Sequence, residues 1–143
     1  MSNYFNCKIK FLKMADNGSV YWKTESYLIY SMSFTEAEAK LQANLEESIP
    51  EYNLLAMKKD SITSVIYNET SDLFFKAKIT FESIDEDSGK SKKATESYLI
   101  QSDSVEEATN SIKEKMVGTV VPWELNSVTK TNIVEVFEEE VKI

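Results

Sequence analysis

The sequence predicts an α+β protein made of two copies of a β-β-α-β-β unit, and three observations support this prediction. The hexapeptide TESYLI occurs at residues 24–29 and again at residues 95–100. A run in which apolar and polar residues alternate precedes each copy, and a helix-start signal follows each copy, at Ser33 and at Ser104. Six identical residues in one register indicate an internal duplication.

The duplication extends over nearly the whole chain. Downstream of the hexapeptides the copies align at an offset of 71 residues, and upstream the offset is 70. The change falls in the Gly-containing turns at Gly18 and Gly89, where an extra residue is tolerated. We therefore expect a single domain over 1–143, made of repeat one at 1–71 and repeat two at 72–143 with a short acidic C-terminal tail.

In repeat one, residues 4–13 alternate as a half-buried strand does, and residues 20–31 form the second strand of a hairpin. Ser33 and Glu36 fit a capping box at the start of a helix. Its predicted apolar stripe consists of Phe34, Ala37, Leu41 and Leu45. Two β-like stretches, near 52–58 and 61–67, complete the repeat.

Repeat two follows the same order. Ser104 and Glu107 repeat the capping box, and Gly118 and Pro122 end the helix. The matching apolar stripe is Val105, Ala108, Ile112 and Met116. Strands are predicted near 123–129 and 132–137. We expect each repeat to form an antiparallel sheet with one helix on its apolar face, and a pseudo-two-fold axis to relate the repeats.

The composition excludes several kinds of site. The 143 residues have a formal net charge of -8 and contain no His. All the basic residues are Lys, and one Cys excludes an internal disulfide and a cysteine zinc site. The sequence shows no signal-peptide pattern and no apolar run long enough to span a membrane. The acidic cluster at 85–87 lacks EF-hand spacing, so no metal and no cofactor are expected.

Four runs carry a resemblance to a known group of proteins. They are YFNCKIKF, LFFKAKITF, TESYLI with the SxxEA helix start, and KMVGTVV. With these runs the chain resembles a small family of uncharacterised proteins found in Bacteroidota and in their phages. The resemblance implies a cytoplasmic setting in a bacterium or a phage-infected cell, and it implies no activity.

Catalysis has few candidate residues. Glu25 and Glu96 occupy the same position in the two hexapeptides, where each carboxylate either acts as a general acid–base or pairs with a Lys across the hairpin. Cys7 is in phase with the core residues Phe5 and Ile9, which favours a small buried apolar role over a nucleophile. We therefore expect a non-enzymatic protein.

Single-stranded nucleic acid is the ligand that the strand pattern favours. Lysines beside aromatic residues on an open sheet face suit a platform where charge follows the phosphates and rings stack on bases. The candidate residues are Lys8, Lys10, Lys76, Lys78, Tyr4 and Phe74. Trp22 and neighbouring tyrosines add rings whose orientation depends on the register of the second strand. The acidic net charge opposes phosphate binding at long range, and without Arg no sequence-specific duplex reading is expected.

An alternative is a protein–protein or small-ligand binding module. Duplicated sheets often form homo-oligomers or bind other proteins. Two related half-sites also suit a symmetric ligand such as a nucleotide, for which the candidate lining is Tyr27, Tyr98, Thr24 and Thr95. The repeated hexapeptide has a purely structural explanation as well, as a hairpin strand that leads into a capped helix.

Overall fold

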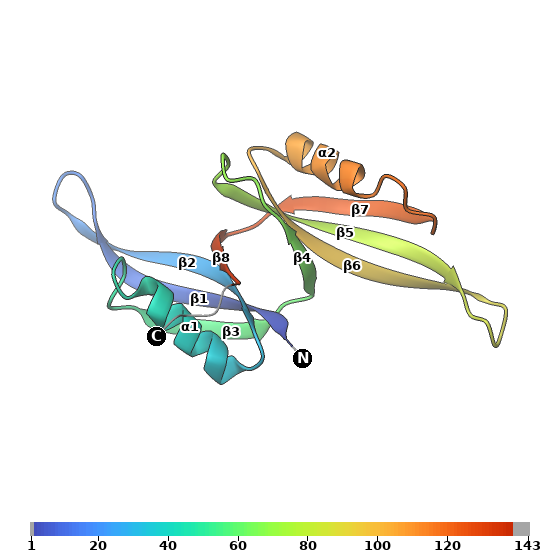
Figure 1. The fold of residues 1–143 in the computed structure, drawn as a ribbon. Helices are drawn as coiled ribbons and strands as arrows, with labels where there is room; N and C mark the ends of the chain where they lie inside the picture. The colour runs from blue at the N-terminus through green and yellow to red at the C-terminus, as the bar shows by residue number, and fades with distance from the viewer. Residues whose placement is uncertain (1, 139–143) are drawn as a thin grey trace. The chain divides into compact units, whose positions relative to one another are not determined.

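The computed structural model describes residues 2–138, and the β-β-α-β-β order occurs twice within them (Figure 1). The elements of repeat one are β1 (Asn3–Met14), β2 (Val20–Ser31), α1 (Phe34–Leu45), β3 (Asn53–Lys59) and β4 (Ile62–Ile66). Those of repeat two are β5 (Leu73–Ile84), β6 (Ser91–Ser102), α2 (Val105–Lys115), β7 (Trp123–Lys130) and β8 (Ile133–Phe137). The predicted α+β fold class is confirmed. The acidic tail after Glu138 lies outside the described residues.

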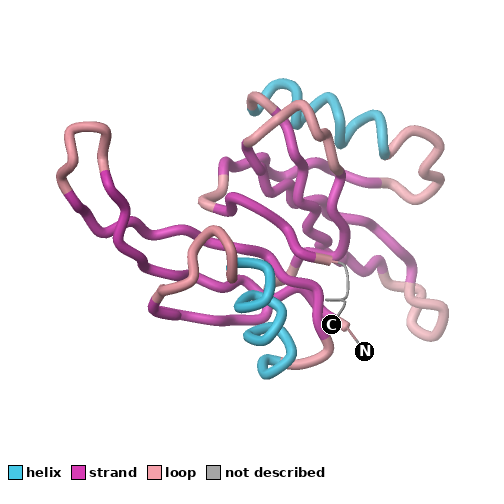
Figure 2. Tube along the Cα trace, turned by 60° about the vertical axis from the view of Figure 1, so that its left-hand side comes forward, coloured by secondary structure: helices cyan, strands magenta, loops and turns pink. Residues whose placement is uncertain are grey.

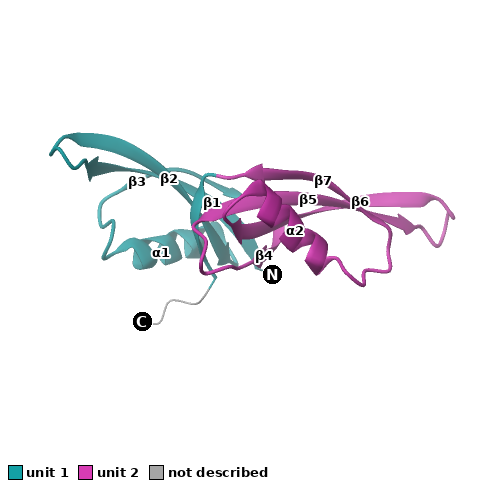
Figure 3. Ribbon diagram, turned by 90° about the horizontal axis from the view of Figure 1, so that it is seen from above, with its two compact units in different colours: residues 1–60, 132–143 teal, residues 61–131 magenta. Residues whose placement is uncertain are grey.

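The strands form two four-stranded sheets, with the orders β3-β1-β2-β8 and β4-β6-β5-β7. Each sheet belongs to one compact unit, coloured separately in Figure 3. Unit 1 comprises residues 1–60 and 132–143, and unit 2 comprises residues 61–131. The units therefore differ from the sequence repeats, because each repeat contributes its last strand to the sheet of the other.

The expectation of purely antiparallel sheets within each repeat needs correction. Strand β8 pairs with β2 in parallel, and β4 pairs with β6 in parallel. A tight hairpin at 60–61 or 131–132 would need backbone with positive φ. Among the described residues only Gly18, Gly89 and Gly118 have positive φ. The backbone at these positions therefore does not form such a two-residue hairpin, and the strand pairing shows that the chain continues into the sheet of the other unit.

The core of each unit lies between one helix and one face of its sheet (Figure 2). In unit 1 the buried strand residues alternate along β1, and α1 covers them with Ala37, Leu41 and Leu45. In unit 2 the helix contributes Ala108, Ile112 and Met116. The alternating pattern predicted these cores. It also placed Phe34 and Val105 in the apolar stripes, but these first helical residues are exposed, and the Phe34 ring packs edge-on against Phe5.

Both helices begin at the predicted serines. The hydroxyl oxygen of Ser33 accepts a hydrogen bond from the Glu36 amide, and that of Ser104 accepts one from the Glu107 amide, at 3.1 Å each. In a full capping box the Glu36 side chain would also accept a hydrogen bond from the Ser33 amide. Here the Ser33 amide donates to Ser31 Oγ instead. Glu36 forms an ion pair with Lys40, one turn along α1, at 3.1 Å. Neither helix within residues 2–138 is long and apolar enough to cross a membrane.

Candidate nucleic-acid interface

The face of the first sheet that points away from α1 carries three lysines, Lys8, Lys10 and Lys58, and we refer to it as the lysine face. Pairing places Lys8 opposite Ser26, Lys10 opposite Thr24 and Lys58 opposite Asn6. Strands β1, β2 and β3 contain one carboxylate, Glu25, which pairs with Ile9 and so lies on the opposite face. This part of the lysine face is therefore basic and polar although the whole chain is acidic.

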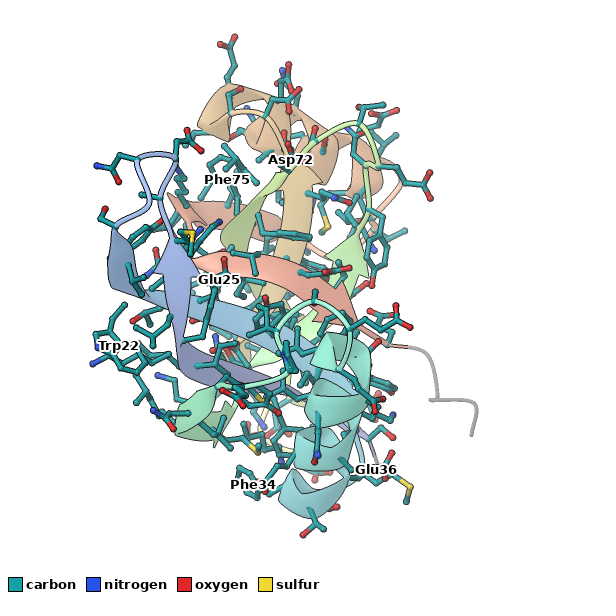
Figure 4. All side chains as sticks on the ribbon, turned by 90° about the vertical axis from the view of Figure 1, so that its left-hand side faces the viewer. Trp22, Glu25, Phe34, Glu36, Asp72 and Phe75 are labelled. Carbon is teal, nitrogen blue, oxygen red and sulfur yellow. The ribbon has the colours of Figure 1, made fainter. Side chains whose placement is uncertain are left out.

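An exposed aromatic ring lies beside these lysines. Trp22 pairs with Leu12, so its side chain is on the lysine face, and 54% of the residue is exposed. Figure 4 shows Trp22 projecting away from the hairpin. The Lys10 Nζ lies 5.0 Å from the centre of the Trp22 ring, within the range of a cation–π interaction. The lysine face thus offers a ring and a cation side by side.

A groove runs along β1 where β3 has ended. Its volume is about 810 Å³, and Lys10 and Trp22 belong both to its lining and to the lysine face. The apolar part of its lining comes from the hairpin and from the segment that follows α1, and includes Leu12, Met14, Ile49, Pro50 and Tyr52. The pairing of β1 with β3 stops at Lys10 and Asn53. In unit 2 the corresponding pairing reaches Phe81 and Trp123, and the Glu82 amide donates to the Pro122 carbonyl.

The corresponding face of the second sheet also carries lysines, but its composition differs. Lys76 and Lys78 lie in one phase of β5, and Lys78 is exposed. The pair Leu12–Trp22 of unit 1 is replaced in unit 2 by the pair Glu82–Lys93. The two units therefore share strand lysines, whereas the tryptophan of this pair belongs to unit 1.

Two of the predicted interface residues are buried, and their predicted stacking role is wrong. Tyr4 is 7% exposed and Phe74 is 4% exposed. The Tyr4 ring contacts the Tyr30 ring, and its hydroxyl donates to Glu138. Alternation predicted correctly which face these residues occupy. Alternation could not predict that one end of this face is buried in each sheet. Leu28 in the first sheet and Leu99 in the second are fully buried there as well.

The predicted ligand residues do not line one site within either unit. Thr24 pairs with Lys10, whereas Tyr27 pairs with Cys7, so the two side chains point to opposite faces of β2. Thr95 and Tyr98 are likewise separated by an odd number of residues on β6. Both tyrosine rings are buried. The Tyr27 ring stacks on Phe137 with centroids 5.5 Å apart, and the Lys115 Nζ lies 5.3 Å from the Tyr98 ring centre.

The repeated glutamates bind these tyrosines. The Tyr27 hydroxyl donates to Glu25 at 2.6 Å, and the Tyr98 hydroxyl donates to Glu96 at 2.7 Å. Burial, with the neighbouring carboxylate, raises the pKa of Tyr98 to about 12 and raises the pKa of Tyr27 further. Glu25 also forms an ion pair with Lys23 at 3.3 Å, on its own strand instead of across the hairpin.

Cys7 is fully buried, as its position in the pattern predicted. Burial raises the pKa of its thiol to about 12, with a smaller contribution from the negative charge of Glu38. The thiol is therefore protonated at neutral pH and acts as a small apolar core group. Within residues 2–138, no three His, Cys, Asp or Glu side chains are grouped so that they could hold a metal ion.

Sequence reasoning did not select two residues of the lysine face. Lys58 follows from the pairing of β3 with β1, which the sequence does not specify, and its neighbour Lys59 is on the other face. Trp22 was recognised as a ring, but its orientation required the hairpin register. The sequence did contain a signal that sets Trp22 apart from the duplicated residues, because the aligned residue of repeat two is a lysine.

Comparison with family models identifies the class of protein. The model of a domain of unknown function, DUF4494, matches residues 3–139, and the chain belongs to this family. No curated protein and no solved structure matched the chain in the other two comparisons.

Proposed function

We propose that the protein is a non-enzymatic binding protein that holds single-stranded nucleic acid, without sequence specificity, on its lysine face. The observation that carries this proposal is the position of Lys10 over the exposed ring of Trp22, on a face free of carboxylates along β1, β2 and β3. Exposed rings bind bases of any identity by stacking, and lysines neutralise the phosphates between them.

The chemistry of the remaining groups also supports a role in binding. Glu25 and Glu96 accept hydrogen bonds from buried tyrosine hydroxyls, so each carboxylate has a structural partner. The Cys7 thiol is buried and protonated. The acidic net charge weakens long-range attraction, and we therefore expect modest affinity that depends on local contacts and decreases as salt increases.

Two adjacent lysines on β3 allow a matched test of the lysine face. Lys58 pairs with Asn6 on the lysine face, and Lys59 pairs with Phe5 on the helix side; both are exposed. We expect Lys58→Glu, combined with Lys8→Glu, to weaken binding to a labelled oligo-dT by at least about tenfold. The slope of the logarithm of the binding constant against the logarithm of the salt concentration should decrease by about one per lysine.

The control is Lys59→Glu combined with Lys113→Glu, which changes the net charge equally; Lys113 is an exposed residue in the last turn of α2. Fluorescence anisotropy at several salt concentrations measures all three proteins. If both double variants lose the same affinity, only net charge matters and the lysine face is not the binding surface.

A second candidate function is a small-ligand or protein-binding module, and the groove favours it. A volume of about 810 Å³ is within the range of small-molecule pockets. Binding of a free nucleotide or of a protein partner that persists at high salt, without binding of oligo-dT, would support this candidate.

The proposal also includes a cytoplasmic setting in Bacteroidota or their phages, which comes from the family resemblance alone.

A further inference from the structure

The groove of unit 1 has a composition that suits one kind of group. It combines an exposed indole ring, a lysine over that ring and a wall of apolar side chains. Its charged lining residues are Lys10, Lys13, Glu25 and Glu51, and Ser48 and Asn53 add neutral polar groups. A flat ring with a polar edge, next to a negative charge, matches these features, and a nucleobase with its phosphate is such a group.

We propose that the unit 1 groove is the base-stacking site of the protein. This inference rests on the proposed function. Its structural basis is the difference between the two pairs Leu12–Trp22 and Glu82–Lys93 at equivalent places in the hairpins. Lys10 and Trp22 belong to the lysine face and also line the groove. A strand held on the lysine face can therefore place a base in the groove while its phosphates stay on that face.

The surrounding strands favour access to Trp22. Strand β3 pairs with β1 only up to Lys10, and β8 pairs with β2 only between Ser26 and Ile29. The end of the hairpin that carries Trp22 is therefore two-stranded, and neither neighbouring strand covers it. The Lys10 ammonium lies over one side of the ring. A base stacked on the exposed ring would have its phosphate near Lys10 or Lys8.

The test compares a labelled oligo-dT with an oligonucleotide of equal length whose sugars carry no bases. We expect Trp22→Ala to weaken binding to oligo-dT by about 5- to 100-fold, the range of one stacked base, and to leave binding to the abasic strand unchanged. Trp22→Phe should retain most of the affinity for oligo-dT, because it keeps a ring.

Tyr21→Ala is the matched control. Tyr21 is the preceding residue, is 44% exposed and pairs with Lys13 on the other face of the hairpin. The Tyr21→Ala variant should bind oligo-dT and the abasic strand as tightly as the wild type does. In a Trp123→Phe background, the fluorescence of Trp22 should also be quenched by oligo-dT, and the abasic strand should not quench it.

The outcomes separate this inference from the proposed function. If Trp22→Ala binds oligo-dT normally while the Lys8/Lys58 variant does not, the strand is held without a base in the groove, and this inference is wrong. The same conclusion follows if Trp22→Ala weakens both strands equally. If thymidine monophosphate displaces oligo-dT completely, the groove is a free-nucleotide site and this inference is wrong. If wild-type protein binds neither strand, the proposed function itself fails.

Discussion

At the residue scale, the repeated hexapeptides are explained by what their side chains contact. Tyr27 and Tyr98 fill the cores of their units, and each hydroxyl donates to the glutamate two residues earlier. The leucine and isoleucine of each hexapeptide are fully buried. Packing therefore accounts for the repetition of TESYLI. Residues that distinguish the copies, such as Trp22 and Lys93, are better candidates for function.

The raised pKa values predict how stability changes in alkali. Above about pH 9 the Cys7 thiol ionises in the unfolded chain and stays protonated in the fold, where its pKa is about 12. Tyr98, with a pKa of about 12, and Tyr27 behave in the same way above pH 10. The unfolded state then binds fewer protons, so the free energy of unfolding decreases as the pH rises.

We expect Cys7→Ala to reduce this decrease between pH 9 and pH 10, where the thiol contributes up to about 1.4 kcal/mol per pH unit. Alanine already occupies the equivalent position 77. Urea unfolding at pH 7, 9 and 10 measures the effect. An unchanged pH dependence in the variant would show that the thiol ionises normally in the fold.

At the element scale, the caps define where the helices begin. Each serine hydroxyl satisfies one amide that has no partner within the helix. We expect Ser33→Ala and Ser104→Ala each to lower the free energy of unfolding by about 1 kcal/mol. Thr35→Ala, an exposed change within the first turn of α1, should have little effect. Equal losses at Ser33 and Thr35, measured by urea unfolding, would contradict the capping role.

The strands and helices could be predicted because their signals are local. Alternation along 4–13, the Gly-containing turns and the Ser-x-x-Glu motifs each depend on a few neighbouring residues. The partner of the fourth strand depends on distant residues, and alternation cannot identify it. One local clue was present: Asp60-Ser61 and Thr131-Asn132 lack the glycine that a tight hairpin favours. The candidate site was predicted in part, since Lys8 and Lys10 followed from alternation whereas Lys58 required strand pairing.

At the scale of the whole molecule, the exchange of β4 and β8 joins the two repeats. Ile133 pairs with Ser26 of β2 and is 5% exposed, so repeat two supplies a buried residue to unit 1. Ile62 has the same relation to unit 2, where it pairs with Ser97. Each sheet is therefore completed by a strand from the other repeat.

We expect Ile133→Ala and Ile62→Ala each to lower the free energy of unfolding by about 2–5 kcal/mol, because each leaves a cavity at a buried site. Hydrogen exchange at the amides of Ser26–Ile29 should become faster in Ile133→Ala, while the amides of β6 should change less. Val134→Ala is the control, since Val134 is 42% exposed. Retained protection at β2 in the Ile133 variant would argue against the exchanged strand.

The binding of wild-type protein to single-stranded DNA tests the central claim most directly. Fluorescence anisotropy compares a labelled oligo-dT with a duplex of the same length, at low and at physiological salt. We predict binding of the single strand that weakens as salt increases, and weaker binding of the duplex because its bases cannot reach Trp22. Absence of single-strand binding at low salt, or equal binding of both nucleic acids, would contradict the account.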